Sequence, residues 1–373
     1  MTLETDRSSA ASVTRDGRYH LVRRPSDVRA VFNNSVDFRA ANALTAVTPL
    51  TAQSLRVLQQ VDFALPPVLA SNDGESHRGI RRVVSGFFTP ATVSAIEPRI
   101  RELARAASVE AAASLRDSGR VDLVTTIAAH PPAIVMLDML GLPIRDLPEL
   151  KAWSRNSLEL FWGWPDDDRQ LELARSVAEF YEWLRELVDE AVAADTRNLF
   201  TALHSHGLSG AEIRSIGYFL LIAAQETTSQ LTSTTLFRVL DGTVGLGWET
   251  VGTRAGASAA IRHVLAHESS GPTARRIVDL DTEFGGVVIP AGSEILLELT
   301  GNHDIDAETT DYSLAFGSGM HRCLGARLAE LEATVLIEQT AIALTGIRLV
   351  DTKPTWLQLL SFRSPHSVIV ERL

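Results

Sequence analysis

A glycine-rich loop that carries the only cysteine of the chain is the first place where the sequence indicates chemistry. Residues 316–325 read FGSGMHRCLG, and the segment that follows has the composition and periodicity of a helix. A helix N-terminus lowers the pKa of a thiol through its dipole and its free backbone N–H groups. Gly317 and Gly319 permit a tight loop, and Gly325 permits the backbone to approach the sulfur closely. The pattern therefore predicts that Cys323 is a thiolate suited to bind a metal.

The loop alone leaves three other interpretations open. A lone cysteine is more often buried and inert. His321 lies two residues from Cys323 and suggests a Cys–His nucleophile, although such dyads are usually assembled from distant parts of a chain. GSGMHR also resembles part of a dinucleotide-binding loop. The GxGxxG pattern fails at its last position, however, and no strand of a βαβ unit precedes it.

A second pattern lies in residues 211–240, a long apolar stretch that is interrupted by Gln-Glu-Thr-Thr at 225–228. A helix that is apolar all round is buried, so polar side chains at its centre need a reason. The ordinary reason is that the threonine hydroxyls donate to the carbonyl groups one turn earlier. The alternative is that the glutamate and threonine take part in chemistry.

Two further pairs have helical i, i+4 spacing. His77 and Arg81 share one face, and an arginine suits a carboxylate ligand. Taken alone, such a pair is more often a surface feature. His263 and His267 have the spacing of a metalloprotease helix and allow a zinc site, but the glutamate that HExxH requires is missing.

The elements that must position these residues are mostly helices. Residues 97–118 and 171–194 are amphipathic at helical spacing, and Asp166–Asp168 are typical of an N-cap. Strand patterns are fewer. They cover Tyr19–Arg23, two runs within 276–299 and a hairpin at 355–371. The fold class predicted is mainly α, of the α+β type with small sheets, in one domain over residues 1–373, because no linker or repeat divides the chain.

Composition excludes several classes of protein. The net charge is -11 and no Lys/Arg run stands out, so no nucleic-acid partner is expected. The first residues, MTLETDRSSA, lack a signal peptide, and no apolar stretch is long enough for a membrane helix. One cysteine cannot form an internal disulfide. We expect a cytoplasmic protein without membrane contact.

The cysteine loop and the helix after it resemble the cytochrome P450 superfamily, whose pattern is Phe-Gly-x-Gly-x-His-x-Cys-x-Gly. The resemblance runs from about Tyr19 to the C-terminus. HRGIR at 77–81 is similar to the family's His-x-x-x-Arg motif. AAQETT at 223–228 is similar to its Ala-Gly-x-Glu/Asp-Thr-Thr segment, with Ala224 in place of the usual glycine.

This resemblance implies a helix-rich triangular prism that binds haem b, with Cys323 as the proximal iron ligand. The propionate-binding residues it implies are His77, Arg81, Arg276 and His321. Other implied haem contacts are Phe316, Gly317, Gly325 and Ala223, and the implied residues of proton delivery are Glu226 and Thr227.

The function implied is that of a bacterial-class haem-thiolate monooxygenase. It would activate O₂ to hydroxylate, couple or desaturate a mostly hydrophobic small molecule, in secondary metabolism such as antibiotic biosynthesis. Electrons would come from NAD(P)H through a ferredoxin or flavodoxin and its reductase, docking beside Arg322 and Arg327. The substrate could be bound to a carrier protein. Its pocket would draw on 44–70, Phe161–Trp164, Leu220–Thr227, 295–299 and Leu359–Phe362.

Three features depart from the family pattern. His263 and Ala266 stand where the Glu-x-x-Arg motif is expected, the stretch 302–316 is shorter than the family's meander, and only a short polar segment precedes Tyr19. We therefore expect a looser brace for the cysteine loop, with His263 as the candidate for a substitute hydrogen bond. The departures also allow an alternative function, a non-catalytic helper that stabilises a partner enzyme such as a glycosyltransferase.

Overall fold

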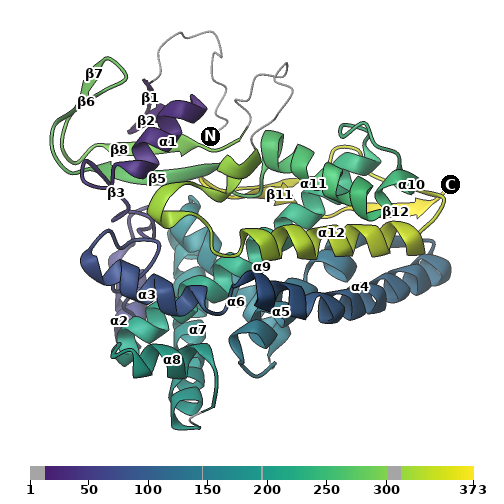
Figure 1. The fold of residues 1–373 in the computed structure, drawn as a ribbon, viewed down its shortest axis with the longest axis horizontal. Helices are drawn as coiled ribbons and strands as arrows, with labels where there is room; N and C mark the ends of the chain where they lie inside the picture. Colours follow the sequence, from purple (N-terminus) through teal and green to yellow (C-terminus); the bar gives the residue numbers. More distant parts are fainter. Residues whose placement is uncertain (1–12, 145, 195, 301–311) are drawn as a thin grey trace.

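Helices make up most of the chain, and one side of the molecule carries the larger sheet (Figure 1). The computed structural model describes residues 13–144, 146–194, 196–300 and 312–373. The helices of this part are α1 Pro25–Asn33, α2 Ala52–Gln60, α3 Glu75–Ser85, α4 Pro90–Ser118, α5 Pro131–Leu140, α6 Leu147–Trp162, α7 Asp167–Ala193, α8 Leu199–Ser205, α9 Gly210–Leu240, α10 Trp248–Val251, α11 Arg254–Glu268 and α12 Ala326–Ala343. The mainly α, α+β fold class predicted from the sequence is confirmed. No helix in these ranges is long and apolar enough to cross a membrane.

Helix α9 is the element around which the other helices pack. It begins at a capping box, in which the Ser209 hydroxyl accepts from the Glu212 N–H and the Glu212 carboxylate accepts from the Ser209 N–H. Most of its side chains are buried, and α5, α6, α7, α11 and α12 all contact it. The helix predicted over 211–240 is confirmed. Its side chains are apolar on all faces, so neighbouring helices have to bury it on every side.

Two other predicted helices differ from the structure mainly at their starts. Helix α4 begins at Pro90 rather than at residue 97, because Thr89 caps it and Pro90 occupies the first turn, where proline is tolerated. Pro98 lies inside the helix. Helix α7 begins directly after Asp166, whose side chain accepts from the Arg169 N–H, as the N-cap prediction requires.

The larger sheet has the strand order β1-β2-β8-β5-β3, and it lies against α1. Its strands are β1 Val13–Asp16, β2 Tyr19–Val22, β3 Phe38–Arg39, β5 Thr273–Val278 and β8 Glu294–Glu298. Strands β2 and β8 are parallel, with Tyr19 opposite Glu294, and the other neighbours are antiparallel. The hairpin of β6 Thr282–Phe284 and β7 Val287–Ile289 joins β5 to β8. The two strand runs predicted within 276–299 are therefore present.

The predicted hairpin at 355–371 is wrong in part. Strands β10 Trp356–Gln358 and β11 Arg363–Pro365 do form an antiparallel hairpin. Strand β12 Ile369–Arg372 instead lies between β4 Arg120–Asp122 and β9 Ile347–Leu349. Alternation of apolar residues identifies a strand but not its partner, and β4 is distant in sequence.

The loop that carries Cys323 is held between α1 and the start of α12. Two 3₁₀ turns, Tyr312–Phe316 and Gly319–His321, lead into it, and the Cys323 N–H donates to the Phe316 carbonyl at 2.8 Å. Gly319 has a positive φ of 66°. A Cβ atom added there would lie 2.8 Å from the Phe32 carbonyl oxygen and 2.8 Å from Asn33 Oδ1. The loop can thus approach α1 this closely only with glycine.

An ion pair of Arg238 joins the end of α9 to helix α11. Arg238 makes a bidentate ion pair with Glu268, in which Nη2 and Oε2 are 2.8 Å apart, and its Nη1 lies 2.7 Å from Asp241 Oδ2. Its guanidinium also lies over the Trp356 ring, 5.1 Å from the centroid. The planar guanidinium satisfies two carboxylates and an aromatic face at once, which a lysine cannot do.

Replacing Arg238 with lysine should lower the free energy of unfolding by about 1–2 kcal/mol, because the bidentate geometry is lost while the charge stays. Urea unfolding followed by circular dichroism measures this loss. Arg185→Lys is the matched control, because its i, i+3 pair with Glu182 is exposed and contributes little. Equal destabilisation by both variants would contradict a structural role for the bidentate pair.

Gly319→Ala should destabilise the protein more than Gly346→Ala. Both glycines have positive φ, so each substitution costs about 1–2 kcal/mol for the left-handed backbone. Nothing lies within 4 Å of a Cβ at Gly346, whereas Gly319 faces the backbone of α1. Thermal unfolding of the two variants tests the difference, and equal losses would show that the loop does not depend on contact with α1.

Candidate active site

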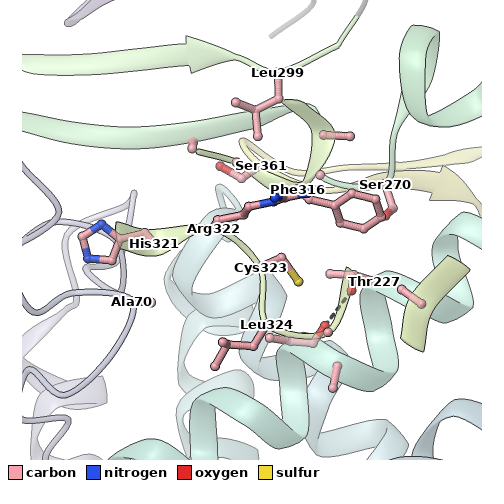
Figure 2. A pocket seen from close by; sticks show the side chains of 18 of the residues that line it. Ala70, Thr227, Ser270, Leu299, Phe316, His321, Arg322, Cys323, Leu324 and Ser361 are labelled. Atoms are coloured by element: carbon pink, nitrogen blue, oxygen red, sulfur yellow. Dashed lines mark hydrogen bonds between the residues drawn. The ribbon is translucent and has the colours of Figure 1, made fainter. Parts of the chain in front are cut away.

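A cavity of about 370 Å³ lies between the cysteine loop and helix α9. Cys323 lines it from the loop, and Ala223, Ala224 and Thr227 line it from the helix. Figure 2 shows the Cys323 sulfur directed into the space on whose far side Thr227 lies. Most of the remaining wall is apolar, from Phe88, Met136, Trp162, Phe219, Leu220, Leu231, Leu265, Leu299 and Phe362. This size and lining are typical of a small-molecule site.

The Cys323 thiol faces the cavity, from which it is accessible although it lies deep in the protein. Burial raises its pKa above the ordinary value for cysteine. A hydrogen bond from the Gly325 N–H and the charges of Arg81 and Arg322 act in the opposite direction. Burial outweighs the helix N-terminus, so the predicted lowering of the thiol pKa is wrong.

Gly325 brings its N–H group to the sulfur, as its position before α12 predicts. A Cβ atom added there would lie 4.0 Å from Cys323 Sγ and 4.0 Å from Phe88, which are ordinary contacts. Its φ of -87° is also open to any residue. The polypeptide around the loop does not itself require glycine at this position.

Basic and imidazole side chains gather at one edge of the cavity. Arg276 is buried at 5% exposure, and burial lowers its pKa to about 10. Its Nη2 lies 3.4 Å from His321 Nδ1, and the His321 and His77 ring centroids are 5.1 Å apart. Burial, followed by the charge of Arg276, lowers the pKa of His321 to about 4. Asp73 Oδ1 also lies 3.6 Å from His321 Nε2, but the guanidinium groups of Arg276 and Arg81 both line the cavity and leave its edge positive.

His77 is the most unusual member of this edge. It is 1% exposed, yet neither ring nitrogen has a hydrogen-bond partner among the residues that the structure describes. Buried polar groups are nearly always hydrogen-bonded, so two such atoms in one ring point to a ligand that supplies the partner. Arg81, one turn later on α3, donates to the Arg322 carbonyl and also lines the cavity.

The two adjacent residues predicted to deliver protons have different surroundings. Thr227 lines the cavity, and its hydroxyl donates to the Ala223 carbonyl at 2.6 Å. The ordinary back-bonded geometry expected for a threonine in a helix is thus present here. The Glu226 carboxylate points to another face of α9, where it forms a buried ion pair with Lys151 of α6.

The structure brings most of the predicted site residues to one cavity. Those that line it are Arg81, Ala223, Thr227, Arg276, Phe316, Gly317, His321, Cys323 and Gly325. His77 packs against His321 just outside this lining, and Glu226 is turned away from it. The predicted pocket segments contribute Leu69, Ala70, Trp162, Leu220, Leu299, Ser361 and Phe362.

Sequence reasoning missed the polar residues after α11. Ser270 and Thr273 line the cavity, and Figure 2 shows Ser270 and Ser361 above the cysteine. The Thr273 hydroxyl donates to the Leu360 carbonyl at 2.7 Å, which joins β5 to the turn between β10 and β11. A Ser-Ser-Gly run at 269–271 was the only signal, and it carries no periodicity.

The residues at the predicted departures from the family pattern make contacts of their own. Ala266 is buried, and the His263 ring stacks on His267 at 4.4 Å. Arg262 lies over the Tyr312 ring at 5.6 Å, and Tyr312 Oη lies 3.5 Å from Glu330 Oε2. Tyr312 thus links α11 to α12 just before the cysteine loop. The stretch 302–316, predicted to be shorter than the family's meander, lies largely outside the described residues.

The cavity fits an iron porphyrin. Its walls are apolar, as the macrocycle requires, and a thiol faces it from one side. The guanidinium groups at the positive edge suit the carboxylates of haem, and a neutral His77 ring can donate one hydrogen bond to such a carboxylate. No group of three or more His, Cys, Asp or Glu side chains elsewhere in the described ranges could hold a metal ion.

Comparison with known proteins was informative, although no family model matches the chain. The chain is 30% identical over 341 residues to vitamin D(3) 25-hydroxylase of Pseudonocardia autotrophica, covering 86% of this chain and 79% of that protein. It is 29% identical over 318 residues to cytochrome P450 monooxygenase PikC of Streptomyces venezuelae, covering 78% and 70%. Erythromycin C-12 hydroxylase of Saccharopolyspora erythraea is 29% identical over 350 residues, covering 87% and 81%.

Solved structures agree with these relatives. Cytochrome P450 CREJ in complex with (4-ethylphenyl) dihydrogen phosphate superposes with a TM-score of 0.88 at 29% identity, covering 97% of this chain and 94% of that one. The haem domain of an Acinetobacter radioresistens P450 gives 0.87 at 25% identity, covering 97% and 92%. The likeness in sequence and fold extends over nearly the whole chain. The chain therefore belongs to the cytochrome P450 family, among its bacterial monooxygenases.

Proposed function

We propose that this protein is a haem-thiolate monooxygenase that uses O₂ to oxidise a largely hydrophobic small molecule by hydroxylation, coupling or desaturation. The observation that carries the proposal is that one cavity is lined by the Cys323 thiol from its loop and by the Thr227 hydroxyl from α9. Family membership implies haem, and the thiol, the positive edge and the apolar walls suit it.

Cys323 would bind the iron as a thiolate. Bound iron and the positive charges of Arg81 and Arg322 favour the thiolate, which offsets the effect of burial on the thiol pKa. The carboxylates of haem would be held by Arg81, Arg276, His77 and His321, which would give the N–H group of the His77 ring a partner. Phe316, Gly317, Gly325 and Ala223 would pack against the macrocycle. Haem supplies the capacity to activate O₂, and the protein tunes it through this ligand.

Glu226 and Thr227 would move protons to the distal side of the cavity. The Thr227 hydroxyl can exchange its hydrogen bond to Ala223 for one that points into the cavity, because it lines the wall. Glu226 is the acid next to it on the same helix and would replenish that proton.

The cavity favours a substrate with a hydrophobic body and a polar group. Trp162, Phe219 and Leu220 form apolar wall, while Ser270 and Ser361 offer hydroxyl groups near the sheet. Two relatives are named erythromycin C-12 hydroxylase and luteothin monooxygenase. We therefore place the substrate in bacterial secondary metabolism.

Electrons would come from NAD(P)H through a ferredoxin or flavodoxin and its reductase. A second cavity of about 570 Å³ opens on the basic face of α3 and is lined by Arg78, Arg81 and Arg82. Arg322 and Arg327 are exposed on the adjacent cysteine loop and the start of α12. An acidic partner would be steered to this surface.

Cys323→Ser should abolish the red-shifted absorbance band that a reduced haem-thiolate protein shows with carbon monoxide, because a serine hydroxyl does not replace the thiolate. Ser318→Ala, in the same loop, serves as the control and should keep the band. Purified wild type that binds no haem would favour the helper function instead. An unchanged band in Cys323→Ser would refute ligation by this cysteine.

Thr227→Ala should divert electrons from product to hydrogen peroxide while leaving the carbon monoxide band intact. Peroxide released per NADPH, with 7-ethoxycoumarin as a hydrophobic probe and a ferredoxin and its reductase as electron donors, measures this uncoupling. Thr235→Ala is the matched control, because Thr235 is buried on the same helix and donates to the Leu231 carbonyl at 2.8 Å. Equal coupling in both variants would exclude Thr227 from proton delivery.

A further inference from the structure

Two adjacent residues of strand β5 are the only buried arginines in the part of the chain that the structure describes. Arg275 is 3% exposed and Arg276 is 5% exposed, and both line the cavity. Successive side chains of a strand point to opposite faces of its sheet. Arg276 faces α1 and the cysteine loop, where its guanidinium lies over the Phe32 ring and beside His321. The role proposed for Arg276 with haem therefore does not account for Arg275, which faces the other way.

The guanidinium of Arg275 lies against the loop of residues 40–51, which connects β3 to α2. Its Nη2 donates to the carbonyl group of Thr45, a residue that is itself exposed. The Tyr19 hydroxyl of β2 is its other hydrogen-bonding neighbour. The Nε atom is buried and has no hydrogen-bond partner among the described residues. Because a guanidinium has five N–H donors, this group keeps unused capacity to bind an acceptor.

The positive charge of Arg275 is not balanced by the charged groups around it. Within the described ranges, the carboxylate that acts on it is Glu294 of β8, and the other cation beside it is Arg18. Glu294 already pairs with Arg18, whose Nε lies 2.8 Å from Glu294 Oε2. One carboxylate shared by two guanidinium groups leaves one positive charge in excess. A buried charge without a partner is costly, so its presence beside a cavity points to a ligand that supplies the balancing charge.

Hydroxyl groups continue the polar surface beside Arg275. Thr273 lies two residues earlier on the same strand, shares the face of Arg275 and lines the cavity. Its Oγ1 lies 3.0 Å from Ser361 Oγ, and Ser361 lines the cavity as well. Figure 2 shows Ser361 and Ser270 above Cys323. The cavity thus combines mostly apolar walls with one side that carries hydroxyl groups and an unbalanced cation.

We propose that Arg275 binds an acidic group of the substrate, a carboxylate or a phosphate. This inference rests on the proposed function and names the polar group that the cavity selects. The oxygens of either group match the planar, paired donors of a guanidinium. Their negative charge balances the excess positive charge, while the hydrophobic body of the same molecule lies along the apolar walls. The substrate is therefore an amphipathic acid rather than an alcohol, an amine or a hydrocarbon.

Probes that share a decyl skeleton separate the effect of charge from that of hydrophobicity. Isothermal titration calorimetry of the ferric holoenzyme gives the dissociation constants of decanoic acid, decyl phosphate, 1-decanol and decyltrimethylammonium. At least one of the acids should bind on the order of tenfold to a hundredfold more tightly than the alcohol, and the cation should bind most weakly. The tighter acid identifies the group as carboxylate or phosphate. Acids that bind no more tightly than 1-decanol would overturn the proposal.

Variants of the arginine locate this preference. Arg275→Gln should weaken binding of the preferred acid on the order of tenfold to a hundredfold and leave 1-decanol unchanged, whereas damage to packing would weaken both. Arg275→Lys keeps the charge without the paired donors and should be intermediate. Arg39→Gln is the matched control, because Arg39 lies on the neighbouring strand β3 but is exposed and pairs with Asp279 at 3.3 Å. Wild-type affinity for the acid in Arg275→Gln would overturn the proposal.

A variant of Glu294 tests the sign of the charge effect. Glu294→Gln removes the carboxylate that attracts Arg275, so the arginine is freer to bind the acid, and the affinity for the acid should rise above that of wild type. A purely structural role of these strands predicts weaker binding instead. An affinity at or below that of wild type would contradict the proposal.

The haem spectrum separates Arg275 from the residues proposed to hold haem. Arg275→Gln should keep the carbon monoxide band and should lose haem to apomyoglobin no faster than wild type. Faster loss of haem would overturn the proposal, because Arg275 would then belong to the haem site. Failure of the proposed function is a different outcome, in which wild type itself lacks the band.

Discussion

One cavity has to be lined by the Cys323 thiol, by the basic side chains at its edge and by the Thr227 hydroxyl of α9. These groups come from distant parts of the chain. The Cys323 loop meets this requirement because close contacts with α1 and with its own backbone hold it in place. Gly319 packs directly on the backbone of α1, and the Cys323 N–H bonds back to Phe316. In this position the sulfur is directed into the cavity opposite α9, so the chemistry of every other site residue depends on it.

Burying polar groups costs free energy, and the buried polar groups described above lie around the proposed active site. His77 lacks hydrogen-bond partners among the described residues, Arg276 is buried beside a neutral histidine, and Lys151 and Glu226 are removed from water together. Local departures from the rules of stable packing are expected at functional sites. Here the bidentate pair of Arg238 with Glu268 and the apolar packing around α9 supply the rigidity that such groups require.

Adjacent residues in a helix can face different surroundings, and this separates the two residues that we propose to deliver protons. Successive side chains of an α-helix point about 100° apart, so Thr227 lines the cavity while Glu226 faces α6. The family motif places both residues in sequence but says nothing of the lysine. Lys151 lies far from the motif along the chain, in a helix whose apolar periodicity indicates only burial.

The sequence by itself determined the helices around the site, the glycines of the cysteine loop and the family, because these depend on local periodicity, on backbone conformation and on a motif of fixed spacing. The tertiary structure alone decided the partner of β12, the burial that raises the Cys323 pKa and the pairing of Lys151 with Glu226. Each of these depends on what packs against a residue from a distant part of the chain. The desolvation of a side chain and the pairing of distant residues or strands leave no local pattern in the sequence. They follow only from the packing of the folded chain.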